Sequence, residues 1–152
     1  MKLGRLRTLR GQIAASGGVA KRNLVIADGL INYGLRITRF TMWPADNVTP
    51  TGPDRIFTGV LSLDPISPID SMDAGTNSQF AWTFFSAAGT PSPSLQQNAR
   101  EIIDPDHIVN RDLFLTMHNT TTGTYNYLVE AQVVELTDDE AIITIIKETS
   151  QS

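Results

Sequence analysis

The densest group of side chains able to do chemistry lies in the segment EIIDPDH, at residues 101–107. It contains the carboxylates of Glu101, Asp104 and Asp106 and the imidazole of His107. Carboxylates and imidazoles bind metal ions and transfer protons as general acids or bases. Asp-Pro-Asp is also common turn sequence, because the proline ring fixes φ while a carboxylate accepts hydrogen bonds from nearby N–H groups. We favour the turn over a metal or acid–base site.

A second acidic group, Asp64, Asp70 and Asp73, shares one loop and suggests calcium as an alternative to an ordinary polar loop. The spacing does not match an EF-hand, and no glycine stands where that loop needs its sharp turn. The polar loop is therefore the favoured interpretation.

Signatures of catalysis are missing from the sequence. It has two histidines and no cysteine, and it contains no G-x-S-x-G, P-loop or G-x-G-x-x-G motif. The lack of cysteine excludes disulfides, thiolate nucleophiles and cysteine zinc sites. We expect neither an enzyme nor a bound cofactor or metal.

Basic residues are concentrated at the beginning of the chain. Up to residue 39, eight basic residues face one acid, a net charge of +7, whereas four face fifteen acids afterwards, a net charge of −11. This asymmetry is typical of a basic end that contacts a polyanion, with a solubilising tail as the alternative. The candidate contacts to nucleic acid or a neighbouring subunit are Lys2, Arg5, Arg7, Arg10, Lys21, Arg22, Arg36 and Arg39.

Such residues neutralise phosphates without reading sequence. The nearest aromatic residues, Tyr33, Phe40 and Trp43, are expected in the core. The basic region would then lack a platform on which bases stack, so base-specific recognition is not expected.

Residues 1–22 are expected to form a basic arm outside the domain. Leu3, Leu6, Leu9 and Ile13 have near-helical spacing, but each of the four glycines in this stretch weakens a helix by about 1 kcal/mol. We predict an extended or partly helical arm that packs on neighbouring subunits or on its own domain. An amphipathic anchor on an anionic membrane uses the same residues and ranks below nucleic acid.

The remainder, residues 23–152, is predicted to be one mainly β domain, an antiparallel sandwich or jelly-roll-like barrel. Residues 119–123 are expected to close a hairpin between the last two strands. Strands are predicted at 24–27, 35–43, 55–63, 78–86, 112–118 and 124–136, with a short extended segment at 101–103.

A short helix is predicted over about 138–148. Thr137 and Glu140 form a capping box, and Leu136 is placed to pack on the first turns. The acidic residues at 138–140 favour the positive end of the helix dipole.

The composition bears on how the surface is covered. The 152 residues suit one domain, and only 18% are charged against ~25% in typical soluble domains. We therefore expect other subunits to cover part of the exterior. No apolar run reaches the ~18 residues of a membrane span, and no secretory signal is expected.

Three parts of the chain carry a resemblance to a known class of proteins. They are the basic MKLGRLRTLRGQIAASGGVAKR, the strand-rich span from Asn23, and the closing segments DPDHIVNRDLFL and YNYLVEAQVVELTDDEAIITIIKE. Together they resemble the small capsid proteins of environmental viruses or phages. The resemblance implies a jelly-roll domain, an icosahedral shell of many copies, and basic arms directed at the packaged genome.

The leading hypothesis is therefore a self-assembling structural protein of a virion. Its expected partners are many copies of the same chain and viral nucleic acid, with other virion proteins as a further alternative. Removing residues 1–22 is expected to abolish packaging and leave the fold. The alternatives are a soluble β module that binds nucleic acid without sequence preference, and a phage neck, tail or spike subunit.

Overall fold

The computed structural model of the chain describes residues 2–24, 32–45, 55–66, 72–75, 78–88 and 96–150. Within these ranges the chain is mainly antiparallel β structure with a short helix at its C-terminal end, arranged like a sandwich, as predicted. The elements are β1 (Lys2–Leu24), β2 (Tyr33–Pro44), β3 (Arg55–Ser62), β4 (Gln79–Ala88), β5 (Gln96–Ile103), β6 (Ile108–Val109), β7 (Leu113–Glu135) and α1 (Asp138–Ser150).

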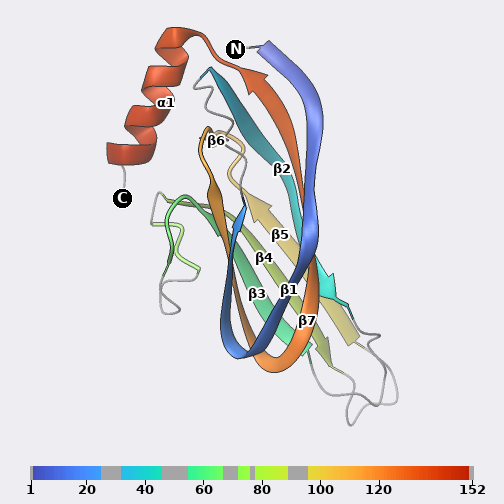
Figure 1. Ribbon diagram of the computed structural model, residues 1–152. Coiled ribbons are helices and arrows are strands. Elements are labelled where there is room, and N and C mark those ends of the chain that lie inside the picture. The colour runs from blue at the N-terminus through green and yellow to red at the C-terminus, as the bar shows by residue number, and fades with distance from the viewer. Residues whose placement is uncertain are drawn as a thin grey trace.

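Two long strands, β1 and β7, connect the layers of the sandwich. They pair with each other antiparallel over nearly their whole length, from Lys2 opposite Glu135 to Leu24 opposite Leu113. Their register shifts between Ser16 and Gly18, and Figure 1 shows both ribbons turning back at the lower end of the view. Each strand therefore contributes one half to each layer.

The layers differ in which strands complete them. In the β2 layer, residues 124–135 of β7 lie between residues 2–14 of β1 and strand β2, and β6 pairs with β2. In the β4 layer, residues 113–119 of β7 lie between residues 18–24 of β1 and strand β3, followed by β4 and β5.

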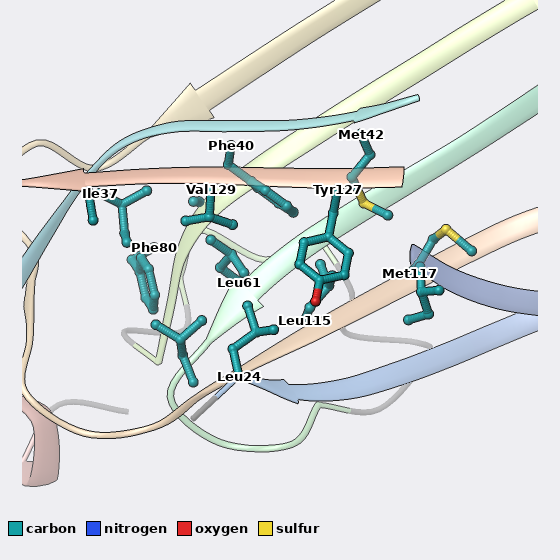
Figure 2. Close-up of a cluster of buried hydrophobic side chains, with 14 of the residues drawn as sticks. Leu24, Ile37, Phe40, Met42, Leu61, Phe80, Leu115, Met117, Tyr127 and Val129 are labelled. Atoms are coloured by element: carbon teal, nitrogen blue, oxygen red, sulfur yellow. The ribbon is translucent and has the colours of Figure 1, made fainter. Parts of the chain in front are cut away.

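The hydrophobic core fills the space between these layers. Figure 2 shows Phe40 and Met42 of β2 meeting Leu61 of β3 and Leu115 of β7, and all four are at most 2% exposed. The layers approach closely at Gly59, where an added Cβ would lie 2.6 Å from the Met42 sulfur.

Period-two patterning accounts for this core. In β7, Tyr125, Tyr127, Val129 and Ala131 face inward and are buried, whereas the residues between them are half-buried on the outer surface. Such alternation is the behaviour of a strand with one face on the core.

The strands predicted at 35–43, 55–63 and 78–86 are confirmed with small changes of boundary, and the extended segment predicted at 101–103 is the end of strand β5, which begins already at Gln96. Of the strand predicted at 24–27, Leu24 ends β1 and the rest lies outside the described residues.

The hairpin predicted at 119–123 is wrong. The segments on either side belong to one strand, β7, and pair with β1, β2 and β3 rather than with each other. The chain does turn back at these residues. The segments on either side enter opposite layers, because β1 follows the same bend.

The predicted helix is confirmed as α1. Thr137 N–H donates to Glu140 Oε1 and Glu140 N–H donates to Thr137 Oγ1, both at 3.2 Å, which completes the capping box. Leu136 and Ala141 are buried in one small cluster with Val134. This contact between the residue before the cap and the second turn fixes how the helix leaves β7.

Candidate nucleic-acid and subunit interface

Six of the eight predicted contact residues lie on strand β1, at an edge of the sandwich. Residues 2–24 pair with β7 over nearly their whole length, and Ile13 and Leu24 belong to the core. The separate arm predicted for residues 1–22 is therefore not confirmed, and this stretch packs on its own domain. A strand forms here because glycine disfavours the helical alternative while the edge of β7 offers a long pairing partner.

The cations in the first part of β1 are divided between its two faces. Arg7 stands opposite the buried Ala131 and is half-buried, on the same side as Ile13. Arg10 stands opposite Leu128 on the outer side and is exposed. Lys2 and Arg5 are exposed near the beginning of the strand, where Lys2 lies opposite Glu135.

Arg22 connects the two layers at their shared edge. Its Nη1 donates to the main-chain oxygen of Gln12 in the β2 layer, and its guanidinium lies 5.9 Å from the centroid of the Tyr127 ring. Lys21, the neighbouring residue, is exposed opposite Thr116 on the other side of the strand. The structure therefore separates two adjacent predicted contacts, and only Arg22 has a clear structural role.

Arg36 and Arg39 of β2 share the outer surface of the β2 layer with Arg10. Because β7 lies between β1 and β2, its register with both strands aligns the outward side chains in rows. We call this surface the outer β2-layer face. Its four rows, from β1 across β7 to β2, are Gln12–Asn126–Trp43, Arg10–Leu128–Thr41, Thr8–Glu130–Arg39 and Leu6–Gln132–Arg36.

This face contains an aromatic residue that was expected in the core. Trp43 is 40% exposed and Tyr33 is 42% exposed, whereas Phe40 is buried as predicted. Once Phe40 and Met42 are assigned to the core, strict alternation places Trp43 outward. The pattern was thus available in the sequence, but the bulge between Ile37 and Arg39 obscures it over the full strand.

Around Trp43 the face is hollowed into a shallow groove of about 470 Å³, lined among others by Arg10, Gln12, Asn126 and Leu128. Gln12 Nε2 donates to Asn126 Oδ1 at 2.9 Å across the row. Nearby, Arg39 Nε donates to Thr41 Oγ1 at 3.3 Å, and that hydroxyl donates to Glu101 Oε2 at 2.9 Å. The groove combines an aromatic ring, amides and a guanidinium.

In the segment EIIDPDH, residues 101–103 end strand β5 and residues 104–107 form a turn. Asp106 N–H donates to Asp104 Oδ1 at 3.0 Å, and Asp104 N–H donates to the oxygen of Phe80 at 2.9 Å. The His107 ring stacks on Phe80 with centroids 4.6 Å apart, and Glu101 accepts the hydrogen bond from Thr41. These groups are directed to different neighbours.

The second acidic group is likewise divided. Asp64 forms an ion pair with Arg111 at 3.5 Å, and Asp73 Oδ1 accepts the Gly75 N–H at 2.8 Å. Asp70 lies outside the described residues. Among the residues that the structure describes, no three metal-ligating side chains come together.

In the ranges described, no helix has the length and apolar character needed to cross a membrane. No protein-family model matches the chain, and no curated protein matches it either.

Proposed function

We propose that this chain is a structural protein of a virion, that its β domain is a jelly roll, and that many copies assemble into a capsid. Three strand pairs support the jelly roll because they are nested: β1 pairs with β7, β2 with β6, and β3 with β4, while β2 and β3 each also pair with β7. Rolling such a nested ribbon into two sheets produces the double-sheet fold found in viral capsid domains, and also in lectins and cupins.

The observation that carries self-assembly is the apolar surface left at one end of the molecule. Leu3 and Leu6 of β1 are 61% and 72% exposed, and Ile142, Ile143 and Ile146 of α1 are each more than 50% exposed. Figure 1 shows the start of β1 and helix α1 at the same end of the sandwich. Exposed apolar side chains gathered at one end of a molecule are typical of protein–protein contacts.

The edge of β1 supports the same proposal. Among the described strands, none pairs with the far edge of β1, so its main-chain groups there face outward. An exposed edge strand is a template for pairing with another chain. A second copy at this edge would cover Leu3 and Leu6.

The cations of β1 supply the proposed contact with the packaged genome. Lys2, Arg5 and Arg10 are exposed while the chain as a whole carries −4. Positive side chains release the counterions condensed on phosphates, so the contact depends on salt rather than on base sequence.

The test is the nucleic acid protected by assembled particles. Particles of the unaltered chain are expected to shield nucleic acid from nuclease, and the double variant Arg5→Gln/Arg10→Gln is expected to form particles that shield less. Arg100→Gln removes an exposed cation from the β4 layer and serves as the control. Equal protection by the double variant and the control would refute the role of β1 in packaging.

One observation favours a second candidate, a soluble module that binds nucleic acid without assembling. Trp43 is exposed beside Arg10 in the groove, an arrangement that needs no other copy of the chain. Such a module would be a monomer whose affinity for oligonucleotides falls steeply with salt.

A further inference from the structure

The exposed ring of Trp43 has a setting that suits a base. Trp43 lies at the end of β2, directly before Pro44, and its neighbours across the sheet are Asn126 and Gln12. The Gln12–Asn126 hydrogen bond uses one donor and one acceptor of this pair. The side-chain oxygen Oε1 of Gln12 and the side-chain amino group Nδ2 of Asn126 take no part in that bond. They can form hydrogen bonds with the polar edge of a stacked base.

Positive charge continues from the groove along the same face. Arg10, Arg39 and Arg36 occupy the three successive rows beyond the Trp43 row, against two carboxylates, that of Glu130 and that of Glu101, which accepts from Thr41. Rows on one strand face repeat every second residue, or about 6.8 Å. The four rows therefore extend over about 20 Å, with the aromatic ring at one end and guanidinium groups along the rest.

We infer that the outer β2-layer face binds single-stranded nucleic acid, with a base stacked on Trp43 and backbone phosphates on Arg10, Arg36 and Arg39. This inference rests on the proposed contact with nucleic acid and identifies the form that is bound. A single strand is required because its bases expose their faces, whereas those in a duplex are already stacked. Stacking tolerates any base, so the binding is not sequence-specific.

The direct test uses the fluorescence of Trp43 in the full chain. The only other tryptophan, Trp82, is half-buried on β4 and donates to Gln79, so Trp82→Phe leaves Trp43 as the sole reporter. Titration with a 15-nucleotide thymidine strand is expected to quench Trp43. A duplex of equal length is expected to quench less at the same salt concentration.

Affinity is then measured by the anisotropy of a labelled strand. Trp43→Ala is expected to weaken binding about 5- to 150-fold, the range set by loss of one stacked base, while Trp43→Phe restores most of the affinity. Arg10→Gln is expected to reduce the slope of log affinity against log salt by about 0.7, one phosphate contact. The control Arg100→Gln should change neither quantity, and circular dichroism verifies folding of each variant.

The outcomes separate this inference from the proposed function. If the strand binds with equal affinity to the parent and Trp43→Ala, the inference is wrong while contact through other cations stands. If Trp43→Ala weakens binding of the duplex by the same factor as binding of the single strand, the inference is also wrong. If the unaltered chain binds neither strand nor duplex, the proposed nucleic-acid contact fails together with the inference.

Discussion

At the scale of single residues, Arg22 shows how position in the fold decides the role of a charge. It was expected to contact nucleic acid, but its guanidinium is placed between the main chain at Gln12 and the ring of Tyr127. A cation–π contact made by an exposed cation such as Arg22 contributes about 0.5–1 kcal/mol, and a hydrogen bond from a charged group adds to it.

We therefore predict that Arg22→Gln lowers the free energy of unfolding by about 1–2 kcal/mol. Lys21→Gln removes the same charge from the adjacent, exposed position and is the matched control, with an expected change within about 0.5 kcal/mol. Urea denaturation measures both. Equal midpoints for the two variants would show that Arg22 does not hold the layers together.

For Trp43, the orientation of the side chain could be predicted from the sequence, but its neighbours could not. The buried partners Phe40 and Met42 could be assigned to the core from their type, and alternation then directs Trp43 outward. Its juxtaposition with Arg10 and Gln12 could not be predicted, because it depends on β7 lying between β1 and β2. Residues more than 100 positions apart in sequence define that row.

At the scale of elements, β1 is the strand whose role changes most between sequence and structure. Its leucines at near-helical spacing and its glycines favoured an arm, whereas pairing with β7 makes it part of both layers. Strands with plain alternation and the capped helix could be predicted locally. The strands that pair on either side of residues 119–123 could not be predicted from the local sequence, because the partner of each half of β7 is distant in sequence.

This pairing predicts the effect of truncation. Removing residues 1–22 deletes most of β1, removes Ile13 from the core and leaves the edge of β7 uncovered. With total stabilities of only about 5–15 kcal/mol, a domain does not tolerate the loss of such a strand. We expect the truncated chain to lose its cooperative thermal transition in circular dichroism.

The charge variant Arg5→Gln/Arg10→Gln is the control for truncation, since it retains the strand and should retain the transition. If the truncated chain melted at the same temperature as the intact one, residues 1–22 would be an arm that the fold does not need. Packaging is therefore better tested by changing charges than by deleting the strand.

At the scale of the whole molecule, charge and apolar surface are both distributed unevenly. Eight of the twelve basic residues lie on β1 and β2, while Leu3, Leu6 and the isoleucines of α1 leave apolar surface at one end. Charged residues make up only 18% of the chain, so few charges are available to keep the surface of an isolated copy soluble. Contact between copies would cover the apolar end, including Leu6 in the fourth row of the outer β2-layer face, and leave the other three rows of that face for nucleic acid.

The most direct measurement is the mass of the full chain in solution by size-exclusion chromatography with multi-angle light scattering. We predict particles of many copies of the 16.6 kDa chain, formed with or without added nucleic acid at physiological salt. A ring or trimer would instead indicate an accessory virion subunit. A stable monomer over the accessible range of concentrations would contradict self-assembly.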